Sequence, residues 1–281
     1  MKHSWKLLSR PFDESLREAL QQQHHAAQFI ALTGRHLLPQ QPDDSNTNME
    51  YLPGKGLLAG HEVVPGVRLA LHLTEMKLCI LSGEECTGEI PLDGKTRQQV
   101  FEMTRELLSG AGIDVSRLKD ELHYEIPEHP LDKGAAYNTR DRERFGENTL
   151  YRHNAQIILE EITARRTEAD PVRIWPHHFD TGTLIPLEQD RQGNLLKSLG
   201  PGLAIPDSMV PEPYFYLSFW SKDPAEVPGN MPAPGKGRWM MPQWNGAILP
   251  LSTLLKASGA EEQHLMAQEF FLSGIETLSN L

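Results

Sequence analysis

Four segments of the chain repeat apolar side chains at the three- and four-residue spacing of an amphipathic α-helix. The segments are residues 13–32, 95–110, 148–167 and about 260–278. The first carries a stripe formed by Leu16, Leu20, Ala27 and Ile30. Asp13 stands where a side-chain cap is expected, and Gly110 and Gly112 stand where a helix is expected to stop. The pattern therefore predicts four helices.

Between these segments, apolar and polar side chains alternate with the period of a β-strand. In residues 67–73 every second side chain is Val or Leu. The other expected strands are 77–81, 85–92, 122–126, 172–185, 212–220, 238–243 and 247–251. Residues 172–185 are expected either as one long strand or as a strand kinked at Pro176. Ser82-Gly83 and Asn245-Gly246 are turn signals. Hairpins interspersed with helices predict an α+β fold with antiparallel sheets and covering helices.

The order of these elements suggests two pseudo-repeated halves packed as one globular unit. Residues 1–130 would form the first α+β half, 131–147 a connecting loop and 148–281 the second half. Residues 88–110 and 246–274 both read as a strand followed by an amphipathic helix and end in Leu-Ser-Gly. Duplication would explain this echo, although α+β chains also resemble one another without it. In a duplicated chain, a cleft between the halves is the natural ligand site.

Charge and composition disfavour some classes of binding partner and indicate a cellular location. The net charge of −11 disfavours a nucleic acid or an anionic membrane surface as the partner, because both require a basic face. The first residues lack the apolar core of a secretory leader, and no run of about 18 apolar residues occurs, so we expect neither a leader nor a membrane span. We therefore expect a cytoplasmic protein with free thiols. Cys79 and Cys86 could lie opposite each other in a hairpin, which leaves a redox pair open.

The stretch WPHHFD, residues 175–180, is the richest in chemistry. In a strand, successive side chains alternate faces, so His178 and Asp180 would share one face while His177 points to the other. Asp180 could orient His178 as a general acid or base. Binding of a divalent transition metal by this stretch is a further alternative. It would need a remote third ligand, for which the candidates are His153, His72, His61 and Glu188. The structural alternative is a polar strand face with Trp175 and Phe179 in the core.

Aromatic side chains gather in the second half and could line an apolar pocket. We take the ligand-binding candidates to be Trp175, His177, Tyr214, Tyr216 and Trp239. His24 and His25, inside the first predicted helix, are expected on a solvated or interfacial face. Serine-hydrolase, dithiol and dinucleotide-binding motifs are absent from the sequence.

The order of several segments resembles a bacterial family known only as domain of unknown function 5996. The resemblance covers residues from about 60 to the end. It rests on LALHLTEMKLCIL, EIPL, VFEMTRELLSGAGIDV, HYEIPEHP, PVRIWPHHFD, VPEPYFYLSFW and AILPLSTLL. The family pattern has a tryptophan-containing strand ending in Phe-Asp, which Trp175, Phe179 and Asp180 match, and it does not require the two histidines. The resemblance implies an architecture and no established activity.

These observations favour a protein that binds a small molecule in a cleft between two α+β halves. One alternative is a metal-assisted or His/Asp acid–base hydrolase that uses His178 and Asp180. The other is a protein-interaction module with an exposed aromatic face. The sequence leaves the ligand and the oligomeric state open.

Overall fold

The protein is described by a computed structural model over residues 4–223 and 231–280, in which it forms two compact units. The first unit comprises residues 13–149 and 173–179, and the second comprises the other described residues. The chain therefore crosses between the units more than once. The α+β class expected from the sequence is confirmed, with two antiparallel sheets and helices.

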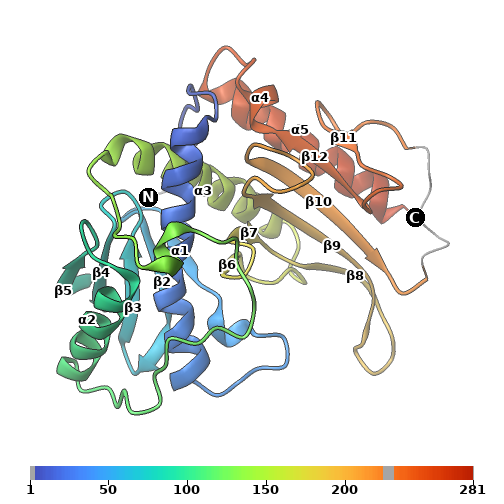
Figure 1. Ribbon diagram of the computed structural model, residues 1–281. Helices are drawn as coiled ribbons and strands as arrows, with labels where there is room; N and C mark the ends of the chain where they lie inside the picture. The colour runs from blue at the N-terminus through green and yellow to red at the C-terminus, as the bar shows by residue number, and fades with distance from the viewer. Residues whose placement is uncertain (1–3, 224–230, 281) are drawn as a thin grey trace. The chain divides into compact units, whose positions relative to one another are not determined.

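A five-stranded antiparallel meander forms the centre of the first unit (Figure 1). Its strands are β1 (Glu50–Leu52), β2 (Leu57–Val64), β3 (Val67–His72), β4 (Lys77–Ser82) and β5 (Glu85–Pro91). Helix α1 (Glu14–Leu37) packs on β2 and β3, while α2 (Arg97–Gly110) packs on β4 and β5. Two 3-10 turns, η1 (Ser45–Thr47) and η2 (Pro130–Lys133), and strand β6 (Arg173–Trp175) complete the unit.

Local capping explains where these two helices begin. The Asp13 carboxylate accepts a hydrogen bond of 2.9 Å from the Leu16 amide, which satisfies one of the donors left over at a helix start. Thr96 and Gln99 form a reciprocal capping box at the start of α2. The apolar stripe predicted for the first helix is buried in α1.

The middle of α1 is buried on all sides and is unusually polar. Gln22, Gln23, His24, His25 and Gln28 are all buried, with at most 4% of each residue exposed. The expectation of a solvated or interfacial face for His24 and His25 was therefore wrong. Their hydrogen-bond partners are backbone carbonyls of loops that pack on the helix, such as Pro176 O and Pro127 O. Periodicity missed this because it counts a buried, satisfied polar group as a surface one.

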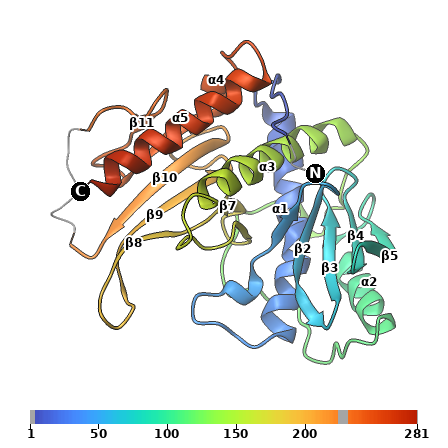
Figure 2. The same ribbon diagram turned by 180° about the vertical axis from the view of Figure 1, so that it is seen from behind.

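The second unit also contains an antiparallel sheet. Its strands are β7 (Asp180–Gly182), β8 (Ile185–Gln189), β9 (Leu195–Ala204), β10 (Tyr214–Ser221), β11 (Arg238–Trp239) and β12 (Gly246–Pro250). The order β11-β12-β10-β9 is continued by β7 and β8, which both pair with β9. Helices α4 (Leu251–Leu254) and α5 (Ala260–Ser279) follow β12. Helix α5 packs on β10 and β12 (Figure 2), where the Phe215 and Phe271 rings meet at 5.7 Å.

Several sequence-based expectations need correction. No strand forms at 122–126, and the expected loop 131–147 contains η2 and the start of α3 (Arg142–Thr163). Strand β9 was not predicted. Each expected strand–helix pair of the internal echo exists, as β5 followed by α2 and as β12 followed by α4 and α5. The strand orders of the two units differ, however, so duplication is not confirmed.

Gly34 provides a test of how α1 packs on η1. An added Cβ would overlap the Asn46 carbonyl oxygen and lie 2.9 Å from Thr47 Cα. Replacing glycine by alanine inside a helix ordinarily stabilises it by about 1 kcal/mol. We expect Gly34→Ala instead to destabilise the protein by roughly 1–3 kcal/mol, as overpacking does. Urea unfolding monitored by circular dichroism measures this change.

The matched control is Gly110→Ala at the end of α2, where an added Cβ meets nothing within 4 Å. This variant should be neutral or slightly stabilised. A Gly34→Ala protein as stable as Gly110→Ala would contradict the described packing of α1 on residues 46–47.

Candidate functional site

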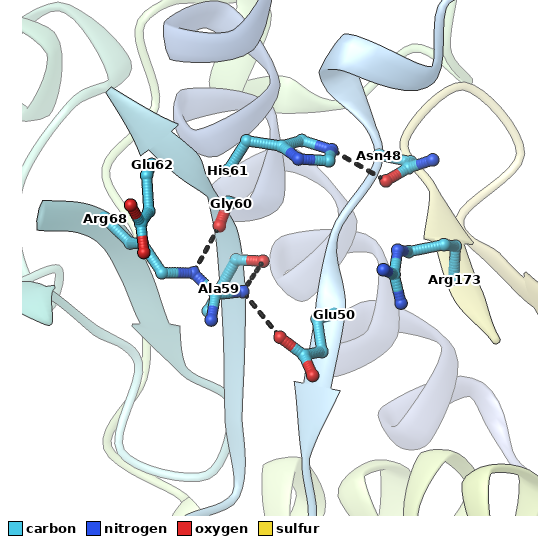
Figure 3. A pocket seen from close by; sticks show the side chains of 8 residues that line it. All are labelled: Asn48, Glu50, Ala59, Gly60, His61, Glu62, Arg68 and Arg173. Atoms are coloured by element: carbon cyan, nitrogen blue, oxygen red, sulfur yellow. Dashed lines mark hydrogen bonds and ion pairs between the residues drawn. The ribbon is translucent and has the colours of Figure 1, made fainter. Parts of the chain in front are cut away.

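Within the first unit, a polar pocket lies beside β1 and β2 (Figure 3). It has a volume of about 170 Å³, which suits a ligand smaller than a typical drug molecule. Ala59 and Gly60 contribute backbone to its wall. The side chains that line it are Asn48, Glu50, His61, Glu62, Arg68 and Arg173. We call it the Arg68–Arg173 pocket.

Arg68 is held rigidly on one side of the pocket. Its Nε donates to Gly60 O at 2.6 Å, and its Nη2 donates to Glu50 Oε2 at 2.8 Å and to Ala59 O at 3.3 Å. Among the described residues, none accepts a hydrogen bond from its Nη1. Because a guanidinium is planar, fixing two of its nitrogens also fixes the third. Arg68 is therefore a preorganised donor with unused capacity.

His61 adds a neutral imidazole to the lining. Its Nε2 lies 2.9 Å from Ser45 O and 3.0 Å from Asn48 Oδ1. Both partners are oxygen acceptors, so the proton is assigned to Nε2 and Nδ1 is left as an acceptor. Burial lowers the pKa of His61 below its ordinary value of 6.5, and the positive charges of Arg173 and Arg68 lower it further, against the Ser45 hydrogen bond.

Arg173 reaches the pocket from a distant part of the sequence. It begins β6, whose next residue, Ile174, exchanges two backbone hydrogen bonds with Met49, of 2.9 and 2.8 Å. This bridge places Arg173 beside Asn48 and Glu50. In Figure 3 its guanidinium faces the pocket from the side opposite Arg68. The two cations therefore approach one small cavity from two directions.

The carbonyl of Pro176 is a second anchor for the segment that carries Arg173. Pro176 O lies 2.8 Å from His24 Nε2 and accepts a second hydrogen bond, of 3.0 Å, from Gln28 Nε2. The ring of Phe179 stacks on His24 at 4.9 Å with an interplanar angle of 4°. His24 and Gln28 lie one turn apart in the buried middle of α1, and their bonds to Pro176 O account for two of its polar side chains.

The structure corrects the expected geometry of WPHHFD. Strand β6 ends at Trp175, residues 176–179 form a turn, and Phe179 adopts a left-handed conformation with φ of 51°. Alternation of faces does not apply in a turn, so the argument that placed His178 and Asp180 on one strand face was wrong. Phe179 is buried as expected, whereas Trp175 is only partly buried.

The predicted site residues divide between the two units. Trp175, His177 and His178 belong to the first unit, where the His177 ring lies 4.4 Å from that of His178 and 6.3 Å from that of Trp175. Asp180, Tyr214, Tyr216 and Trp239 belong to the second unit. None of the seven lines the Arg68–Arg173 pocket.

Within the second unit, the structure joins Asp180 to Tyr216. The Tyr216 hydroxyl donates a hydrogen bond of 2.5 Å to Asp180 Oδ2. Burial, followed by the charge of Asp180, raises the pKa of Tyr216 well above its usual value, so this hydroxyl remains protonated and donates. The rings of Tyr214 and Tyr216 lie 6.5 Å apart. Tyr214 donates to Asp207 at 2.6 Å.

Trp239 does not join the two tyrosines. It pairs across strands with Ala247, while Tyr216 pairs with Ile248, so the indole lies on the other face of the sheet. Its Nε1 donates to Pro232 O at 2.7 Å.

Sequence reasoning missed most of the pocket lining. It named His61 only as a possible remote metal ligand and did not single out Asn48, Glu50, Arg68 or Arg173. The available signal was the polar pair His61-Glu62 directly after the apolar start of β2. Arg173 carried no local signal, because only the tertiary fold brings it to residues 48–50.

Comparison of the chain with protein-family models, with curated proteins and with solved structures found no match. The resemblance to domain of unknown function 5996 therefore stays a prediction. Within the described part of the chain, every helix is too short or too polar to cross a bilayer.

The lowered pKa of His61 has a consequence for stability. A histidine whose folded-state pKa lies below 6.5 binds protons less readily in the folded than in the unfolded state. The contribution of His61 to the free energy of unfolding is complete above pH 6.5 and is lost as the pH falls below that value. His25 and His72, whose pKa values burial also lowers, act in the same direction. We expect urea midpoints to fall from pH 7.5 to about pH 5, and His61→Gln to reduce the slope.

His178→Gln is the matched control, because this exposed histidine lies outside the pocket. It should keep the wild-type slope. A His61→Gln protein with the full wild-type slope would show that His61 is not held neutral by its surroundings.

Proposed function

We propose that the protein binds a small organic anion, with a carboxylate or phosphate group, in the Arg68–Arg173 pocket. The observation that carries this proposal is the approach of two guanidinium groups from opposite sides to one cavity. A guanidinium offers paired N–H donors that match the oxygens of a carboxylate or phosphate.

The rest of the lining favours an anion that also carries a donor group. Glu50 neutralises Arg68 through their 2.8 Å ion pair, and Glu62 accepts a hydrogen bond from the Gly66 amide. The remaining side-chain acceptors include His61 Nδ1 and the second carboxylate oxygens of Glu50 and Glu62. A hydroxyl or amino group on the ligand would satisfy one of them. The proposed ligand class is therefore a small hydroxy- or amino-substituted acid, which suits a cavity of about 170 Å³.

This proposal keeps the small-molecule class expected from the sequence and locates the site in the first unit. The hydrolase alternative depended on Asp180 orienting His178. Since the described hydrogen bond of Asp180 comes from Tyr216, we do not carry that alternative further. The expectations of a cytoplasmic location and of no nucleic-acid partner stay predictions based on charge and composition.

Removing Arg173 tests the proposal. We expect Arg173→Gln to weaken binding about 10- to 100-fold, because a charge-assisted hydrogen bond contributes roughly 1.5–3 kcal/mol. Binding is measured by isothermal titration calorimetry with inorganic phosphate, glycolate, malate and glutamate as probes. The matched control is Arg191→Gln, an exposed arginine in the turn between β8 and β9. It should bind like the wild type.

Two results would contradict the proposal. One is that none of the probes binds the wild-type protein. The other is that binding is equally strong in Arg173→Gln and in Arg191→Gln, which would place the anion outside this pocket.

A further inference from the structure

Three metal-ligating side chains converge on the outer face of the five-stranded sheet, which is the face away from α1 and α2. They are His72 at the end of β3, Cys79 in β4 and Cys86 in β5. An imidazole nitrogen and the two sulfur atoms all lie within 4.8 Å of one another. Across the described ranges 4–223 and 231–280, this is the one group of three such ligand atoms.

Strand register explains why these residues meet. Ala70 faces Cys79 and His72 faces Lys77 across the β3–β4 pair, so His72 and Cys79 share one face of the sheet. Cys86 faces Leu81 on β4, which places it diagonally from Cys79 on the same face. The meander therefore brings one donor from each of three neighbouring strands to one place.

The surroundings separate this face from the α1 side. Gly60 shows which face α1 covers, because an added Cβ there would lie 2.6 Å from the Ile30 side chain. The opposite face carries a small buried apolar cluster formed by Leu57, Ala59, Ala70, Cys79 and Leu81. Cys79 is buried in that cluster, while His72 and Cys86 are partly exposed at its margin. An ion from solvent can therefore reach the donors without opening the helical side.

We propose that His72, Cys79 and Cys86 bind a transition-metal ion that prefers thiolate and imidazole ligands, with Zn²⁺ as the expected ion. Zinc binds thiolate sulfur at about 2.3 Å and imidazole nitrogen at about 2.0–2.1 Å, so tetrahedral donors lie roughly 3.5–3.8 Å apart. The observed separations of at most 4.8 Å need only small side-chain adjustments. The two sulfur atoms, now 2.7 Å apart through a hydrogen bond, would move apart by about 1 Å.

Neighbouring charges favour a cation at this place. Glu89 faces Cys79 across the β4–β5 pair, and Glu75 and Glu89 each form an ion pair with Lys77, at 2.7 and 3.0 Å. The two carboxylates and the single ammonium leave one net negative charge beside the donors. With three protein ligands, the fourth coordination position is left for water, as in zinc sites that keep an open position.

Zinc binds the thiolate form of cysteine. A metal ion therefore displaces the thiol protons, so both cysteine protons are released on binding and the affinity rises with pH.

The test uses the full chain, reduced and freed of metal with a chelator. Titration with Co²⁺ should give one bound ion per chain, with thiolate-to-cobalt charge-transfer absorption in the near ultraviolet. Zn²⁺ should displace the cobalt. We expect Cys86→Ser and His72→Gln each to weaken Zn²⁺ binding at least about 100-fold, because even loss of a residue that only supports a ligand costs 10- to 100-fold. His36→Gln, at the end of α1, is the matched histidine control and should bind like the wild type.

Each possible result either supports the proposed metal site or overturns it. One ion per chain, with charge transfer lost in both variants and kept in the control, supports the proposal. No binding, binding without thiolate charge transfer, or binding unchanged in both variants overturns it. A disulfide in the unreduced protein, seen by mass spectrometry, together with no Zn²⁺ binding after reduction, also overturns it. If Cys86→Ser does not fold, His72→Gln decides the question alone, because its side chain is only partly buried.

Discussion

The carbonyl group of Pro176 fixes the part of the first unit on which the candidate site depends. It accepts a hydrogen bond from Gln28 and lies 2.8 Å from His24 Nε2, and both side chains come from the middle of α1. Around it, Phe179 stacks on His24 and Ile174 pairs with Met49. These contacts hold residues 173–179 on a unit otherwise built from residues 13–149. Without them Arg173 would not stand opposite Arg68.

This arrangement explains why α1 carries polar side chains at buried positions. A buried glutamine or histidine without a partner would cost roughly 1–3 kcal/mol. The α1 side chains reduce that cost by bonding to other segments of the first unit. Gln23 donates to the carbonyls of Leu73 and Phe145, His25 bonds to Pro127 O, and Gln22 accepts from the Asn138 amide. The helix therefore organises the loops of the first unit through specific polar bonds as well as through apolar packing. Burial lowers the pKa of His25, so the folded unit loses stability as the pH falls below the ordinary value of 6.5.

The sequence was sufficient where structure is local. The apolar stripe of α1, the hairpin of β3 and β4 and the final helix follow from periodicity and turn residues, and the α+β class follows from their order. Strand β9 was missed because LGPGLA, residues 199–204, reads as a loop. Its glycines are required by a neighbouring strand, since an added Cβ at Gly202 would overlap the ring of Tyr216. The sequence of β9 alone does not indicate that the neighbouring strand requires glycine at these positions.

The same limit applies to the candidate site. WPHHFD attracted attention because its residue types are chemically versatile, and period-two alternation then assigned their faces. The left-handed backbone at Phe179 and the turn before it removed the basis of that assignment. Arg173 stands two residues before the motif and was passed over. Its role depends on the bridge between Ile174 and Met49, a contact between residues 125 positions apart that no local pattern encodes.

The docking of residues 173–179 on the first unit is the central claim of this account. Native-state hydrogen exchange tests it most directly, because the Met49 and Ile174 amides donate to each other's carbonyls in the bridge. The account predicts that both amides are protected to a similar degree as those of β2 and β3. Rapid exchange at Met49 and Ile174, while the amides of β2 and β3 remain protected, would contradict it.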